Sequence, residues 1–216
     1  MREVVCNSGS GANSNNSHNN NNLSSSKGVC ELISIPDDIY FLVDQTGSMT
    51  EETDRLKADL ITGDFVNDDA YECADYDFDQ VPNNELKTQG IIGAIRCNIR
   101  DSNFGVGFFR EIPFPTYAGN DHVAFGNEQD ITNNVADVLV GVEQLQNIGN
   151  YEWPEASMLA LHSLATGDGM YFGVTKTSIP TRTTCPAGTW GYPCFRDGAI
   201  PIVVMFTDAM FHNGPD

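Results

Sequence analysis

The chain has 216 residues, of which 30 are acidic and 11 are basic, and its net charge is −19. This length is sufficient for one domain with a buried core. The charge disfavours nucleic-acid binding, because phosphates would be repelled, and it concentrates cations around the protein.

The first thirty residues carry almost no apolar pattern, and residues 7–27 are mainly Asn, Ser and Gly. Such a segment cannot bury enough apolar surface to offset the entropy lost on ordering. We therefore expect residues 1–32 to form a disordered leader or linker, and residues 33–216 to form the domain. The first residues lack the apolar core of a signal peptide, and no run reaches transmembrane length, so we expect no direct membrane insertion.

In the first half of the domain, the apolar run 39–44 does not alternate, which indicates a strand buried on both faces. A helix is predicted from residue 51 to about residue 65, with acidic residues at its start and an apolar stripe along it. Residues 66–90 are acidic and irregular and are interpreted as an insertion. A second strand is predicted over 104–109, followed by a loop over 112–128.

In the second half, a periodic apolar stripe predicts a helix over 130–146. Pro154 then opens a helix over 155–165, and Gly167 ends it. A long loop covers 168–197, and a third buried strand is predicted over 199–206. This order of elements predicts an α/β fold with a doubly wound, mainly parallel sheet flanked by helices.

A group of oxygen donors follows the first buried strand: Asp44, Thr46 and Ser48. Such donors suit Mg²⁺, Ca²⁺ or Mn²⁺ and not zinc. Two further acidic loops contain Glu155 and Asp208, and ligands of such sheets bind beyond the carboxyl ends of the strands. We therefore predict one divalent-cation site where the three loops meet.

The alternative interpretation of the Asp44, Thr46 and Ser48 group is a helix N-cap, which needs no metal. The two additional acids favour the cation instead. Three clustered carboxylates without a cation would repel each other and have raised pKa values.

These residues resemble the von Willebrand factor A domain family, and most closely its integrin β subunits. The run Asp44-Gln45-Thr46-Gly47-Ser48 corresponds to the family's Asp-x-Ser-x-Ser metal-ion-dependent adhesion site, and Pro154-Glu155 to the Pro-Glu step of integrin β subunits. The strand ending in Thr207-Asp208 corresponds to the family's third loop. Bacterial secreted A-domain proteins also look similar around Pro154-Glu155-Ala156 and Thr207-Asp208-Ala209.

The resemblance implies that Thr46, Ser48 and Glu155 bind the metal directly, and that Asp44 and Asp208 bind it through water. An open position then accepts a carboxylate from a partner. The resemblance spans about residues 37–216, and the family's sheet continues further, so we expect the domain to be incomplete at its C-terminus.

The resemblance also implies flanking metal sites. Glu51 and Glu52 stand where integrin β subunits carry adjacent aspartates, although surface acids favoured by the helix dipole are the preferred interpretation. The second flanking site would use these residues: Glu111, Asn150, Glu152, the Pro154 carbonyl and Glu155. For Glu111, a solvated acid at a strand end is an equal alternative.

Six cysteines are present and none forms a CxxC pair, which argues against zinc. Cys185 and Cys194 flank a Pro/Gly-rich loop and can close a short disulfide. The simplest pairing of the others is Cys6–Cys30 and Cys73–Cys97, out of 15 connectivities for six cysteines. The even count favours an oxidising, extracytoplasmic compartment over a cytosol with free thiols.

We therefore expect a secreted or cell-surface adhesion or ligand-binding module, not an enzyme. It would bind an Asp or Glu carboxylate of a partner protein through a divalent cation, with Mg²⁺ first and Ca²⁺ or Mn²⁺ as alternatives. The rival is an aspartyl-phosphate phosphotransferase of the haloacid dehalogenase or P-type ATPase kind, with Asp44 as nucleophile. Gln45 replaces the Lys of that motif, and no paired aspartates lie near Asp208. A chelatase-type A domain is disfavoured by the six cysteines.

Overall fold

The computed structural model describes residues 2–7, 29–61, 90–99, 101–112, 123–146, 148, 155–171 and 179–211. The chain divides into two compact units, Met1–Ile35 and Pro36–Asp216. In the first unit, β1 (Arg2–Asn7) and β2 (Val29–Ser34) pair antiparallel, with Cys6 opposite Cys30. Strands therefore stand at both ends of the segment expected to be disordered, and the Asn/Ser-rich stretch between them lies outside the described residues.

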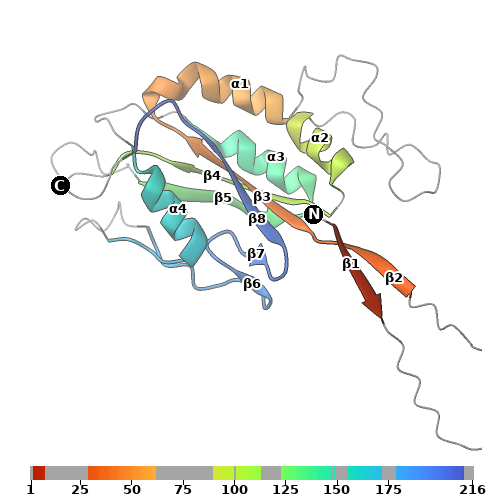
Figure 1. Ribbon diagram of the computed structural model, residues 1–216. Coiled ribbons are helices and arrows are strands. Elements are labelled where there is room, and N and C mark those ends of the chain that lie inside the picture. The colour runs from red at the N-terminus through yellow and green to blue at the C-terminus, as the bar shows by residue number, and fades with distance from the viewer. Residues whose placement is uncertain are drawn as a thin grey trace, which may run out of the picture. The chain divides into compact units, whose positions relative to one another are not determined.

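The second unit is built on a mixed four-stranded sheet with the order β5-β4-β3-β8 (Figure 1). The central strand β3 (Asp37–Asp44) lies parallel to both β4 (Asn103–Phe109) and β8 (Ile200–Phe206). The edge strand β5 (Phe125–Thr132) runs antiparallel to β4. The three strands expected from their apolar runs are confirmed, and so is a mostly parallel sheet flanked by helices. The expected burial of the third strand is wrong, because every residue of β8 is partly or fully exposed in the structure.

Helices cover both faces of this sheet. One face packs against α1 (Thr50–Ile61), α2 (Gly90–Asn98) and α3 (Val135–Gln144), and the other against α4 (Ser157–Thr166), as Figure 1 shows. Side chains of β3 alternate between the two cores: Phe41 and Val43 enter the first, and Tyr40 and Leu42 the second. Burial on both faces is the physical reason for the non-alternating apolar run of this strand. None of the described helices combines the length and apolar character needed to cross a bilayer.

Two expectations for the middle of the chain are wrong. The predicted loop 112–128 contains the start of β5, and the helix expected from Asp130 begins only at Val135. The strand is polar, with Glu128, Gln129 and Asp130 in succession, and it is held by pairing with β4 rather than by its own burial. Ile131 matched the spacing of the apolar residues of the expected helix, but it lies in β5. There its backbone N–H donates to the Pro193 carbonyl.

Other boundaries shift by less. The helix expected to extend to about residue 65 is described as far as Ile61, and the 3-10 turn η1 (Gly47–Met49) precedes it. The short helix α2, which no pattern predicted, begins at the end of the expected insertion, and residues 62–89 lie outside the described part. The helix α4 ends as predicted, with Gly167 in the left-handed conformation at φ 75°.

The segment after α4 packs on the same face of the sheet as α4. It carries the short hairpin of β6 (Thr189–Trp190) and β7 (Phe195–Arg196), and the predicted disulfide Cys185–Cys194 is present. Phe195 and Tyr192 enter the second core, so the segment closes the face that α4 leaves open. Cys73 and the side chain of Cys97 lie outside the described residues.

A close approach inside the sheet explains Gly107. Tyr40 crosses β4 at this position and donates its hydroxyl to Asn127 Oδ1 at 2.8 Å. A Cβ atom at Gly107 would overlap both the Tyr40 hydroxyl and the backbone carbonyl oxygen of Gly126. Only glycine therefore fits between these two atoms.

We expect Gly107→Ala to lower the free energy of unfolding by about 3 kcal/mol, because overpacking at this point must displace backbone. Urea unfolding followed by circular dichroism measures the loss. In a double-mutant cycle, Tyr40→Phe should offset part of it by removing the hydroxyl, while the Gly126 carbonyl still clashes. Additive losses in that cycle would show that the hydroxyl is not what excludes the methyl group.

Candidate functional site

Three segments far apart in the sequence meet at the carboxyl ends of the parallel strands. They are the loop after β3, the loop after β8 and the entry into α4. Thr207 Oγ1 donates to Asp44 Oδ2 at 2.8 Å, and Ser48 Oγ donates to Asp208 Oδ1 at 3.0 Å. The backbone N–H of Glu155 donates to the carbonyl of Met210 at 2.9 Å. The loops that the sequence analysis expected to converge therefore touch each other directly.

The loop after β3 is organised by the carboxylate of Asp44, which is fully buried. Its Oδ1 accepts the backbone N–H of Thr46 at 2.9 Å and the Thr46 hydroxyl at 2.7 Å. That hydroxyl also lies 3.3 Å from Ser48 Oγ. Thr46 stands at the N-cap position of η1 but makes no side-chain capping bond, so helix capping does not account for its hydroxyl.

Glu155 is the anomaly of the site. Its side chain is 1% exposed, and neither carboxylate oxygen has a hydrogen-bond partner. Burial and, after it, the charges of Asp44 and Glu111 raise the pKa of Glu155 to about 8. The nearby Thr46 hydroxyl lowers this pKa slightly, but it donates its one proton to Asp44. A buried carboxyl without a donor is costly unless it binds a proton or a cation.

The burial of Asp44 also disfavours its charged form, but hydrogen bonds offset part of this effect. Burial raises its pKa, the hydrogen bonds from Thr46 and Thr207 lower it, and the charge of Asp208 raises it again. Hydroxyl and backbone donors thus oppose the desolvation of Asp44, whereas Glu155 has no such set of donors. The site combines strong oxygen donors with uncompensated negative charge.

A buried pair supports the loop from the opposite side. Arg110 Nη2 donates to Gln45 Oε1 at 2.6 Å, and the Gln45 backbone N–H donates to the Phe109 carbonyl at 3.0 Å. Sequence reasoning assigned no role to Arg110 or to Thr207. Thr207 carried a usable signal, since it is a hydroxyl residue directly after an apolar strand, and Thr46 stands two residues after another such strand. Arg110 carried no such signal.

The predicted flanking residues separate into three groups. Glu111 is 5% exposed and lies close enough to raise the pKa of Glu155, so its interpretation as a solvated acid at a strand end is wrong. Glu51 and Glu52 are exposed in the first turn of α1, where the helix dipole favours them. The remaining predicted residues lie outside the described part of the chain: Asn150, Glu152 and Pro154.

Within the described ranges, no three acidic, histidine or cysteine side chains stand close enough to form a metal site without other donors. No protein-family model matches the chain, and a search of curated proteins finds no match either. The resemblance to A domains thus depends on the residues and contacts of this site alone.

Proposed function

We propose that this protein is a metal-dependent adhesion or ligand-binding module of the von Willebrand factor A type. It holds one divalent cation, most favourably Mg²⁺, and binds an Asp or Glu carboxylate of a partner protein. The observation that carries the proposal is Glu155, a buried carboxyl whose two oxygens have no hydrogen-bond partner. The Thr46 hydroxyl lies close enough to affect its pKa, and Ser48 Oγ lies 3.3 Å from that hydroxyl. A cation supplies the missing positive charge and accepts the carboxylate oxygens as ligands.

The hydroxyls fit this role. Thr46 and Ser48 each donate a proton to a carboxylate, Asp44 and Asp208 respectively, which leaves their lone pairs free to bind a metal ion. Thr46, Ser48 and Glu155 would bind directly, with Asp44 and Asp208 behind them or acting through water. With few directly bound carboxylates, the ion stays electrophilic and attracts the acid group of a partner.

The rival phosphotransferase reaction finds less support. A nucleophilic carboxylate must expose an oxygen to phosphate, whereas Asp44 is fully buried and both of its oxygens accept hydrogen bonds. The Cys185–Cys194 disulfide supports the proposed secreted or cell-surface location, since such bonds persist in oxidising compartments.

The test is thermal unfolding of the full chain in EDTA, Mg²⁺, Ca²⁺ and Mn²⁺. A ligand at one hundred times its Kd adds about 2.7 kcal/mol. For a chain of this size, that corresponds to a Tm increase of about 5–10 °C. Ser48→Ala and Asp44→Asn should both lose this increase.

The matched control is Ser102→Ala, which removes a hydroxyl that donates to the Ile99 carbonyl just before β4. It should keep the full increase in Tm with Mg²⁺. The proposal fails if none of the three cations raises the Tm of the unmodified protein, or if Ser48→Ala responds as the unmodified protein does.

A further inference from the structure

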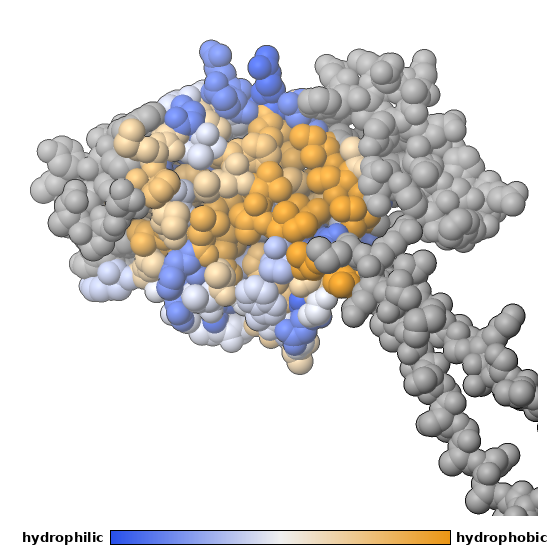
Figure 2. All heavy atoms as spheres, viewed as in Figure 1, coloured by the Kyte–Doolittle hydropathy of each residue, from blue (hydrophilic) through white to orange (hydrophobic). Residues whose placement is uncertain are grey.

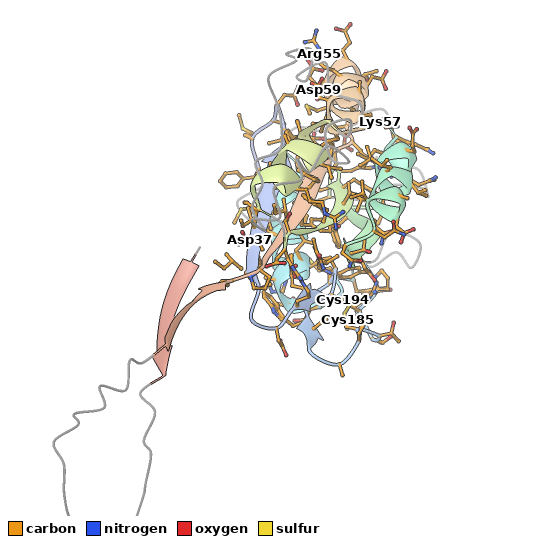
Figure 3. All side chains as sticks on the ribbon, turned by 90° about the vertical axis from the view of Figure 1, so that its right-hand side faces the viewer. Asp37, Arg55, Lys57, Asp59, Cys185 and Cys194 are labelled. Atoms are coloured by element: carbon orange, nitrogen blue, oxygen red, sulfur yellow. A yellow bond between two sulfur atoms is a disulfide. The ribbon has the colours of Figure 1, made fainter. Side chains whose placement is uncertain are left out.

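The Cys185–Cys194 disulfide has no part in the proposed cation site. It belongs to the segment that carries β6 and β7. In Figure 2 the lower rim of the molecule, where Figure 1 places these two strands, is mostly hydrophilic or neutral, in contrast to the apolar surface above it. Figure 3 shows both cysteines at the opposite end of the domain from Arg55 and Asp59 of α1. The disulfide therefore lies next to a polar part of the surface.

The two sulfur atoms of this disulfide have unequal surroundings. Cys194 is 4% exposed, whereas Cys185 is partly exposed. Arg182 Nη2 lies 3.4 Å from Cys194 Sγ. Cys185 Sγ lies instead 3.5 Å from the uncharged carbonyl oxygen of Gly191. An attacking group can therefore approach Cys185, while a guanidinium stands beside the buried sulfur of Cys194.

Two contacts of its side chain hold Arg182 beside the sulfur. Its guanidinium forms an ion pair with Asp130 of β5, and its Nε donates to the Thr184 carbonyl at 3.2 Å. Asp130 Oδ2 lies 4.0 Å from Cys194 Sγ, farther away than the guanidinium nitrogen. The positive partner of the ion pair is thus the nearer one. Negative charge is therefore stabilised on the sulfur of Cys194 more than on that of Cys185.

The backbone of Cys194 is strained. Its φ is 58°, and within the described ranges it is the single non-glycine residue with a positive φ. This conformation is unfavourable for most L-residues and persists where surrounding contacts impose it. Here the turn between β6 and β7 and the disulfide both constrain the residue, so breaking the disulfide removes one of the two constraints. Strained or exposed disulfides are the ones that exchange most readily.

Other contacts hold the segment in place without the disulfide. Tyr192 and Phe195 pack in the second core, and the Tyr192 backbone N–H donates to the Leu164 carbonyl at 3.0 Å. Arg196, directly after Phe195, binds the buried carboxylate of Asp38. Breaking the disulfide should therefore free the two sulfur atoms without detaching the hairpin from the sheet.

We propose that Cys185 is a modification site that exchanges reversibly with a small external thiol, an inference that does not depend on the proposed function. The thiolate of the external molecule attacks Cys185 Sγ and forms a new S–S bond there. The Cys185–Cys194 bond breaks, and its electron pair remains on Cys194 Sγ as a thiolate beside Arg182. One disulfide replaces another, so the step needs no other oxidant or reductant. Attack of the Cys194 thiolate on Cys185 reverses it and releases the external thiol.

The first test locates the modified sulfur. The full chain is incubated with reduced glutathione, quenched with acid and labelled with N-ethylmaleimide at acid pH. One tryptic peptide, residues 183–196, contains both cysteines, and its fragmentation in a mass spectrometer assigns each label. Glutathione on Cys185 with maleimide on Cys194 should exceed the reverse by at least about ten to one. Equal or reversed labelling, or no exchange in the native protein, overturns the proposal.

The second test concerns the guanidinium. Arg182→Met should slow the exchange with glutathione about three- to tenfold, because the leaving sulfur loses its cation. Arg182→Lys keeps a positive charge and should retain most of the rate. Arg55→Met, the same change at an exposed position of α1, is the matched control and should leave the rate unchanged. If Arg182 only fastens the segment, its removal loosens the hairpin and speeds the exchange, so an equal or faster rate in Arg182→Met contradicts the proposal.

A third measurement asks whether the fold survives loss of the bond. The double variant Cys185→Ala, Cys194→Ala removes the disulfide and leaves the packing of Tyr192 and Phe195 in place. Near-ultraviolet circular dichroism should show the aromatic signal of a folded protein at room temperature, with a cooperative thermal transition. An unfolded double variant would make exchange a consequence of unfolding and not a reversible modification, which would overturn the proposal.

Discussion

Glu155→Gln should stabilise the metal-free protein at neutral pH and abolish its stabilisation by Mg²⁺. The folded protein holds the pKa of Glu155 at about 8, well above the ordinary value of 4.5. Between these two values the unfolded chain ionises at this residue while the folded chain keeps the proton. The free energy of unfolding therefore falls as pH rises from 4.5 to about 8, and the glutamine variant lacks this loss.

The magnitude follows from the shift. One pKa unit is worth about 1.4 kcal/mol, so the cost reaches at most about 3 kcal/mol at pH 7 and about 5 kcal/mol above pH 8. Urea unfolding in EDTA at pH 5, 7 and 8.5 measures it. Wild type and variant should have similar stabilities at pH 5 and should diverge as pH rises, with the variant the more stable.

Mg²⁺ should reverse the ranking. A cation needs the carboxylate of Glu155, so in the wild type its affinity should increase with pH up to about 8, and the amide should remove it. Glu143→Gln, a change at an exposed position of α3, is the control and should alter neither property. A glutamine variant that still gains Tm with Mg²⁺, or one that shares the pH dependence of the wild type, would contradict the role given to this carboxyl.

Arg196→Met should lower the free energy of unfolding by about 3–5 kcal/mol, the usual cost of leaving a buried charge unpaired. Asp38 is fully buried, and its Oδ1 lies 2.7 Å from Arg196 Nε. Arg196 Nη2 also donates to the Asp37 and Asp101 carbonyls, at 3.1 and 2.8 Å. One guanidinium thus ties β7 to the start of β3 and to the turn before β4. The variant leaves Asp38 with the backbone N–H of residue 196 as its remaining partner among these contacts.

Urea unfolding measures this loss, and a double variant gives it a sharp control. Asp38→Leu combined with Arg196→Met removes the stranded charge and should be more stable than Arg196→Met alone. Lys57→Met, which changes a cation on the surface of α1, should cost no more than about 0.5 kcal/mol. If the double variant is less stable than the single one, the loss arises from packing around Arg196 and not from the charge of Asp38.

Much of the sheet could be predicted because three of its strands are continuous apolar runs. The runs that became β3 and β4 are continuous and apolar, and burial on both faces favours such a pattern in a strand. The run that became β8 is equally apolar, but none of its residues is buried. The strand β5 was not predicted, because a polar strand can form by hydrogen bonding to its neighbour in the sheet. Residues within one strand do not encode that neighbour.

For the candidate site, residue types and positions at strand ends were sufficient to group Asp44, Ser48 and Asp208. In the structure Ser48 donates to Asp208, and Thr207, the neighbour of Asp208, donates to Asp44. The parallel arrangement made this grouping predictable, because the carboxyl ends of parallel strands lie at one edge. The support from Arg110 to Gln45 was not predictable, since it depends on which side of β4 faces the loop.

Local chemistry can be predicted from the sequence by itself. It indicates which segments are apolar, which residues carry oxygen donors, and where a helix must end. What folding alone establishes is the pairing of those groups in space. Glu155 looks like any loop acid until the fold buries its carboxyl group and leaves both oxygens without a hydrogen-bond donor. Partners, and the lack of them, arise from contacts between distant segments, and those contacts set the free energy of each buried charge.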